Sequence, residues 1–124
     1  MHFPIRQLDR SDFPELLREI PDSPNELFIR GSLPQGGTYL CVVGSRATSA
    51  YGRRTCESLI SGLRGASVAI ISGLALGIDA EAHKAALDAG LKTVAVLPSS
   101  CDDDSLYPAL NFSLAQKILL IDNC

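Results

Sequence analysis

The feature that most constrains the fold is a repeated alternation between short apolar runs and helical stripes, with glycine at the points of change. The apolar runs occupy residues 39–43, 68–71 and 93–97. Each run has the length of a strand and no alternating polar positions, which is typical of parallel strands buried on both faces. The first run ends at Gly44, and Gly73 follows the second.

Helical patterns fill both gaps between these runs. The first stripe is Cys56, Leu59, Ile60 and Leu63, and the second is Ile78, Ala82, Ala85 and Ala89. Repeated strand–helix–strand units predict a parallel sheet with right-handed crossovers. The expected fold class is α/β: a three-layer Rossmann-like parallel sheet with helices on both faces. A short helix within 107–116 and a fourth strand at 117–121 continue the predicted alternation.

The first 37 residues differ from the rest, because five prolines interrupt any long helix. A short helix at 13–19 and an edge strand at 27–29 are expected here. We predict a lead-in segment at 1–37 that covers one end of the sheet, followed at 38–124 by part of a Rossmann-like domain.

Composition limits the classes of protein to consider. A chain of 124 residues with 46% hydrophobic and 20% charged residues fits one small globular domain rather than a disordered segment. Its apolar runs are far shorter than the roughly 20 residues of a membrane span, and its first residues lack a secretion signal. The cysteines form no CxxC pair, so buried free thiols are expected rather than a disulfide or a zinc site. No cofactor and no metal are predicted. These features predict a cytoplasmic protein.

Positive charge is concentrated in the middle of the chain. The net charge is −3, yet residues 44–97 carry six basic and four acidic side chains, an excess of +2. This segment also contains the glycine turns. This small positive excess lies where an anionic ligand would bind, and it is weak support for such a ligand.

The turn after the first strand combines a glycine with hydroxyl groups and an arginine. Ligands of open parallel sheets bind beyond the carboxyl ends of the strands. Here Gly44, Ser45, Arg46 and Ser49 precede a helix, whose free N–H groups attract anions. The guanidinium of Arg46 suits phosphate. The alternative is an ordinary strand–helix turn, with Ser49 as the helix cap and Arg46 in solvent.

The turn after the second strand has two glycines, Gly73 and Gly77, between Ser72 and Asp79. Its backbone amides can line a phosphate site. Asp79 either orients the loop by accepting backbone N–H bonds or receives a donor from a ribose or base. Neither turn has a GxGxxG or GxxxxGK[ST] pattern, so nucleoside triphosphate hydrolysis is disfavoured.

No catalytic residue is assigned, and the chain is predicted not to be an enzyme. His83 lies four residues after Asp79 on the same helical face. Without a nucleophile placed beside it, packing or capping is favoured over catalysis. The adjacent acids Asp102, Asp103 and Asp104 do not project together, which favours a solvated loop over a metal site.

Several strings in this sequence resemble the DNA-processing protein A family (DprA, also called Smf). The most specific is the pattern SGLAxGIDxxAH, which begins at Ser72 and ends at His83. Further matching strings are Val42-Val43-Gly44-Ser45-Arg46, Lys92-Thr93-Val94-Ala95-Val96-Leu97, and Tyr107-Pro108 with Asn111. The resemblance covers nearly all of the chain.

The resemblance implies a protein that binds single-stranded DNA and loads the RecA recombinase in natural transformation and recombination. It places phosphate contacts on Gly44, Ser45, Arg46, Ser49, Ser72, Gly73, Gly77 and Asp79. The family's later strands and self-association surface would follow Cys124, so a fragment or a shortened relative is expected, and a homodimer is left open. Two alternatives remain: a protein that binds or hydrolyses small nucleotides, and a shortened scaffold that does not bind DNA.

Overall fold

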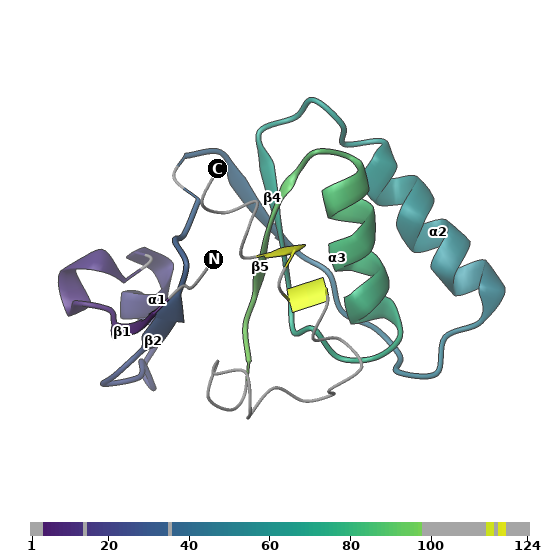
Figure 1. Ribbon diagram of the computed structural model, residues 1–124. Helices are drawn as coiled ribbons and strands as arrows, with labels where there is room; N and C mark the ends of the chain where they lie inside the picture. Colours follow the sequence, from purple (N-terminus) through teal and green to yellow (C-terminus); the bar gives the residue numbers. More distant parts are fainter. Residues whose placement is uncertain (1–3, 14, 35, 98–113, 116, 119–124) are drawn as a thin grey trace.

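The computed structural model describes residues 4–13, 15–34, 36–97, 114–115 and 117–118 (Figure 1). Five strands, two α-helices of more than two turns, and two shorter helical segments are assigned. In chain order they are β1 (Ile5–Gln7), η1 (Arg10–Asp12), α1 (Glu15–Glu19), β2 (Phe28–Arg30), β3 (Thr38–Cys41), α2 (Ala50–Ser61), β4 (Val68–Ser72), α3 (Ile78–Asp88) and β5 (Lys92–Ala95).

The predicted parallel sheet is confirmed, with strand order β3-β4-β5. Leu40 pairs with Ile70, and Ile70 pairs with Thr93, so these three residues form one row across the sheet. The helices α2 and α3 pack side by side, and Ile70 is fully buried among their apolar residues (Figure 1). Both helices lie on the same face of the sheet. A helix layer on the opposite face is not among the described elements and stays a prediction.

Small side chains allow α3 to lie close to its neighbours. Four alanines of this helix, together with Ala89 just after it, are almost fully buried. They are Ala80, Ala82, Ala85, Ala86 and Ala89. Burial of this stripe fixes the rotation of α3 about its own axis, and therefore the position of its first turn, where the second glycine loop ends.

Strand β3 differs from its predicted environment. All four of its residues are exposed, including Tyr39 at 47% and Leu40 at 42%, whereas a strand buried on both faces was expected. Within the described sheet β3 pairs only with β4, so one of its edges and much of its surface stay uncovered. For the same reason Cys41 is an exposed thiol, whereas Cys56 on α2 is buried. Both are free, as predicted, but the predicted burial holds only for Cys56.

Two other predictions are wrong in part. Lys117 and Ile118 are helical rather than the start of a fourth strand. Leu114 and Ile118, four residues apart, both pack against Leu74 and Ala80, and that spacing suits one face of a helix. Leu59, predicted on the buried stripe of α2, is 68% exposed. The Asp102–Asp104 run and residues 107–113 and 119–121 lie outside the described residues.

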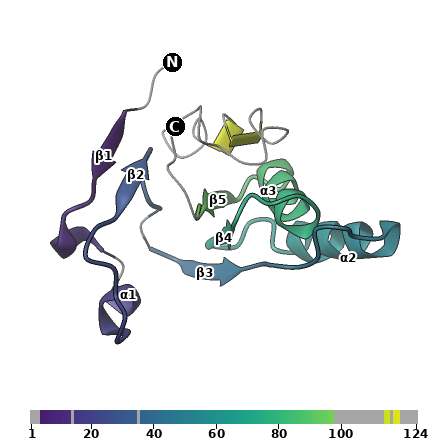
Figure 2. The ribbon, with the colours of Figure 1, turned by 90° about the horizontal axis from the view of Figure 1, so that it is seen from below.

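The lead-in segment forms its own small unit beside the sheet (Figure 2). Strands β1 and β2 pair in antiparallel fashion, and the buried side chains of Leu8 and Phe13 anchor this unit. The predicted short helix and edge strand are both present, with bounds shifted by one or two residues.

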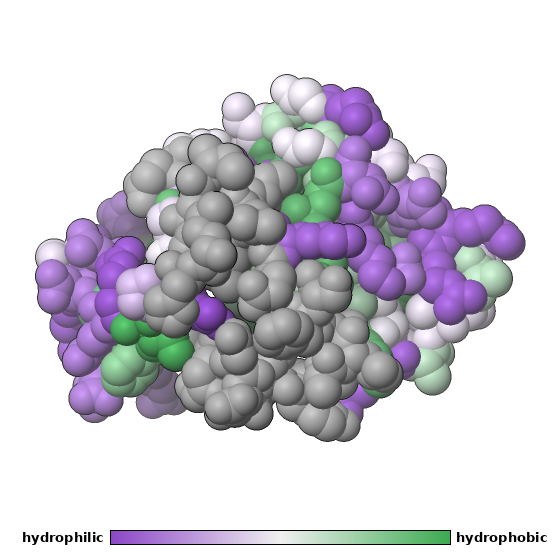
Figure 3. Space-filling view, viewed as in Figure 1, coloured by the Kyte–Doolittle hydropathy of each residue, from purple (hydrophilic) through white to green (hydrophobic). Residues whose placement is uncertain are grey.

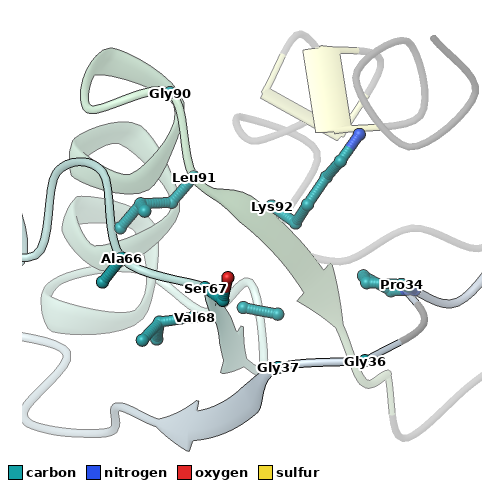
Figure 4. A pocket seen from close by; sticks show the side chains of 10 residues that line it. Pro34, Gly36, Gly37, Ala66, Ser67, Val68, Gly90, Leu91 and Lys92 are labelled. Carbon is teal, nitrogen blue, oxygen red and sulfur yellow. The ribbon is translucent and has the colours of Figure 1, made fainter.

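The segment returns to the main sheet at the amino ends of the strands. The phenol of Tyr39 donates a hydrogen bond to the carbonyl of Pro34 (2.5 Å). Pro34 and Gly37 line a hollow of about 220 Å³ together with Ser67 and Lys92 (Figure 4). This hollow lies at the opposite end of the strands from the glycine turns.

Candidate functional site

The two glycine turns meet at the carboxyl edge of the sheet, from which the chain enters α2 and α3 (Figure 1). The amide of Ile78, the first residue of α3, donates a hydrogen bond to the carbonyl of Ser45 (3.1 Å). A Cβ atom on Gly44 would lie 2.8 Å from the Cβ of Ile78. Gly44, in the turn that follows β3, is thus held directly against the start of α3.

Gly77 makes this close approach possible. Its φ of +82° and ψ of −131° lie in a region that side-chain-bearing residues rarely adopt. A Cβ atom at this position would also overlap the carbonyl oxygen of Ser45 and lie 2.6 Å from that of Arg46. Gly77 therefore serves both the backbone conformation and the contact between the two turns.

The hydroxyl groups predicted to contact phosphate have partners within the protein. Ser45 Oγ accepts the amide of Ala47 (3.1 Å), and Ser49 Oγ accepts the amide of Gly52 (3.0 Å), which makes Ser49 the N-cap of α2. This agrees with the helix-cap alternative for Ser49. Both residues remain exposed and shape the turn.

Ser72 is a buried residue, only 3% exposed. Its hydroxyl donates to the carbonyl of Val42 (2.6 Å) and so ties the end of β4 to the residue that follows β3. The hydroxyl of Ser72 thus has a structural role, and a contact of this residue with phosphate stays a prediction.

Asp79 orients the second loop, the first of its two predicted roles. Its carboxylate accepts the amide of Gly73 (3.1 Å), and the side chain is 8% exposed. Gly73 permits this bond, because a Cβ there would lie 2.9 Å from the carboxylate oxygen. The backbone turn that follows contains Leu74 with a φ of +59°, so the carboxylate holds a loop with a strained residue.

We predict that Asp79→Ala lowers the free energy of unfolding by about 2 kcal/mol, because it leaves the part-buried amide of Gly73 without an acceptor. Asp79→Asn keeps an acceptor oxygen and should lose less. Asp88→Ala is the control, since that carboxylate is exposed at the other end of α3. Urea unfolding measures all three. Equal losses for the two alanine variants would contradict the orienting role.

His83 lies beneath this loop and is fully buried. Its Nδ1 is 2.7 Å from Thr93 Oγ1, which donates to the carbonyl of Ile70 (2.8 Å). Because the threonine proton goes to Ile70, Nδ1–H of a neutral imidazole donates to Thr93. Within the described structure Nε2 has no hydrogen-bond partner. Burial lowers the pKa of His83 to about 4, against the opposing effects of the Asp79 carboxylate and the Ser72 backbone. A neutral, inaccessible ring supports packing rather than catalysis.

The surface left for a ligand consists of one guanidinium and several backbone amides. Arg46 is exposed, and it forms no ion pair with any described carboxylate. At the start of α2, the amides of Gly52 and Arg53 are bound to Ser49, whereas those of Ala50 and Tyr51 have no acceptor among the described residues. Orphan amides at a helix N-terminus favour an anion.

Sequence patterns did not reveal the part played by Ile78, which contacts Gly44 and lies 3.8 Å from a Cβ built on Gly52. Nor did they reveal the bond between His83 and Thr93. The only signal for that bond was a hydroxyl residue within an apolar strand.

A parallel sheet with two converging glycine turns at its carboxyl edge defines a protein of the Rossmann-like fold class. The chain matches the model of the DNA recombination-mediator protein A family over residues 5–123, and it belongs to this family. That match confirms the resemblance seen in the sequence.

Relatives and solved structures agree with this assignment. The chain is 41% identical over 121 residues to the DNA processing protein DprA of Streptococcus pneumoniae, covering 94% of this chain and 40% of that protein. It is 38% identical over 112 residues to the Smf protein of Escherichia coli, covering 90% and 29%. The chain thus spans 40% or less of the length of these two relatives.

Two DprA structures superpose on nearly all of the chain. The X-ray structure of the S. pneumoniae protein has a TM-score of 0.78 and 39% identity, covering 98% of this chain and 41% of its own. The DprA of Helicobacter pylori has a TM-score of 0.79 and 27% identity, covering 95% and 53%. That structure describes a single-stranded DNA binding mode of the H. pylori protein.

Two negative findings concern the described residues alone. None of their helices has both the length and the apolar character needed to cross a membrane. Their histidine, cysteine and acidic side chains form no group of three or more that could hold a metal ion.

Proposed function

We propose that this chain binds single-stranded DNA by recognising its backbone phosphates at the two converging turns, as part of a DNA-processing protein that acts in recombination and natural transformation. The observation that carries the proposal is the contact of Ser45 with Ile78, which holds the exposed Arg46 beside the first turns of both helices. Membership of the family and the DNA-binding H. pylori relative support it.

The donors of this surface suit a phosphate group. Arg46 offers a planar fork of N–H groups and a permanent positive charge. The free amides of Ala50 and Tyr51 add two donors at the positive end of the α2 dipole. Ser45 and Ser49 act indirectly, by fixing the turn that presents these donors. No step in this function requires a nucleophile, a metal or a cofactor.

Arg46→Ala is expected to weaken binding of a dye-labelled oligo-dT roughly 10- to 100-fold at low salt, because it removes a charge-assisted contact with phosphate. Fluorescence anisotropy measures the dissociation constant. The slope of log affinity against log salt should become shallower by about 0.7, as expected for one lost phosphate contact on a single strand.

Arg64→Ala is the matched control, since it removes the same charge from the far end of α2. The guanidinium of Arg64 is engaged there with the carbonyl of Asp88 (3.2 Å). The affinity of the Arg64→Ala variant for oligo-dT should stay within about twofold of that of the unmodified chain. Equal losses for the two arginines would indicate nonspecific charge attraction, and absence of binding by the folded chain would remove the proposal.

A thermal-shift assay distinguishes the alternative ligand, a mononucleotide, from single-stranded DNA. Stabilisation by a nucleoside monophosphate without any effect of oligonucleotides would favour small-nucleotide binding over DNA binding. Absence of both effects would favour the scaffold alternative.

The resemblance also supports two protein partners, the RecA recombinase and a second copy of the chain. Light scattering on the isolated chain tests self-association. Co-sedimentation with RecA on single-stranded DNA tests the loading role.

A further inference from the structure

Tyr51 is an exposed aromatic residue at the border of the proposed phosphate site. It is the second residue of α2, and 73% of its surface is accessible, more than for any other large apolar residue identified as exposed. Its hydroxyl has no hydrogen-bond partner among the described residues. Neither packing nor hydrogen bonding within the described structure accounts for a tyrosine at this position.

The neighbouring residues fix where this tyrosine stands. Gly52 faces inward, since a Cβ there would meet the hydroxyl of Thr48 and lie 3.8 Å from Ile78. Ile78 in turn touches Gly44. The backbone of Tyr51 is therefore one residue away from the contact that joins both turns, and its amide is one of the free donors.

The direction of the side chain follows from helix geometry. Cα–Cβ bonds in an α-helix lean toward its N-terminus, so a residue in the first turn covers the surface that precedes the helix. The segment that precedes α2 runs from Ser45 to the N-cap Ser49 and includes Arg46. By this rule we expect the ring of Tyr51 to lie on the side of that turn.

The charges around the ring select the kind of partner. Arg54, three residues after Tyr51, is exposed on the same face of α2, and the exposed Arg46 precedes the helix. Hydrophilic side chains gather over α2 (Figure 3). A flat ring beside cations suits a nucleotide strand, which offers bases for stacking and phosphates for the arginines.

We propose that the ring of Tyr51 stacks on a nucleobase of the strand whose phosphate is held by the Arg46 turn. The inference rests on the proposed function and extends it, because it makes the unstacked base a second recognised group. Duplex DNA keeps its bases stacked inside the helix, so this contact selects single strands.

The test compares three variants of the full chain on oligo-dT and on an abasic oligonucleotide of equal length. Tyr51→Ala should weaken oligo-dT binding roughly 5- to 100-fold, the range for loss of one stacking contact. Tyr51→Phe keeps the ring and should bind like the unmodified chain. On the abasic strand, which has phosphates but no bases, Tyr51→Ala and the unmodified chain should bind equally.

Leu59→Ala is the matched control on the same helix. Leu59 is exposed to a similar degree, at 68%, but lies two turns farther from the glycine turns. Its replacement should leave both affinities unchanged. Tyrosine emission adds a direct readout, because the chain has three tyrosines and no tryptophan. Oligo-dT should quench the emission of the unmodified chain more than that of Tyr51→Phe.

The outcomes separate this inference from the proposed function. If Arg46→Ala abolishes binding while Tyr51→Ala has no effect, phosphate recognition stands and stacking is refuted. An equal loss for Tyr51→Ala on abasic and normal strands also refutes stacking, since a disturbed turn would then explain it. If Leu59→Ala weakens binding as much as Tyr51→Ala, the outer face of α2 is a docking surface instead. If the unmodified chain binds neither strand, both proposals fail.

Discussion

Gly77→Ala is expected to lower the free energy of unfolding by about 3 kcal/mol, a large loss for a single added methyl group. One part comes from the backbone, since alanine at φ +82° and ψ −131° is strained by roughly 1–3 kcal/mol. The other part comes from overlap of the new Cβ with the carbonyls of Ser45 and Arg46. Thermal unfolding followed by circular dichroism should show a decrease of about 10 °C in Tm.

Gly90→Ala is the control for a positive φ without close contacts. Gly90 has a φ of +73°, but a Cβ there would meet no atom within 4 Å. Its replacement should cost about 1 kcal/mol, from backbone strain alone. The excess loss in Gly77→Ala then measures the close contact between the turns together with the additional backbone strain at ψ −131°. Losses of the same size would mean that the turns move apart easily, and the phosphate site would lose its rigid frame.

The alternation of strands and helices was predictable because it depends on local periodicity. Runs of branched residues and stripes at helical spacing report burial directly, and they placed β3, β4 and β5, α2 and α3 within a few residues. Exposure of β3 was not predictable, because it depends on which elements cover a strand. The same holds for residues 117–118, whose apolar neighbours fit a strand and a helix equally well.

The site was predictable in its location but only partly in its chemistry. Parallel strands bring all their carboxyl ends to one edge, so Gly44 and Gly77 had to be neighbours in that region. Spacing does not show which hydroxyls are already bonded. Ser49 and Ser72 look alike in sequence, yet one caps α2 on the surface and the other is buried against Val42. The difference arises from the pairing of β3 with β4, a contact across thirty residues of sequence.

The buried imidazole gives the fold a dependence on pH that the acidic composition alone does not predict. His83 has an ordinary pKa of 6.5 when exposed, and burial lowers this value to about 4 in the folded chain. Between these values the unfolded chain binds more protons than the folded chain. Stability is therefore fully present above about pH 6.5 and decreases as the pH falls toward 4.

Linkage gives the size of the effect, with a loss of about 2 kcal/mol between pH 7 and pH 5 from His83 alone. Urea unfolding at pH 7, 6 and 5 measures it, in a range where most carboxylates keep their charge. His83→Gln, which cannot gain a proton, should be less stable at pH 7 but should lose much less between pH 7 and 5.

The protonation state itself can be observed in the folded chain by NMR. The ring Cε1 proton of His83 should keep its neutral chemical shift down to about pH 5, while that of an unfolded chain titrates near 6.5. A midpoint near 6.5 in the folded state would show that the ring reaches water. In that case burial would not hold the ring neutral, and the predicted loss of stability between pH 7 and 5 would be absent.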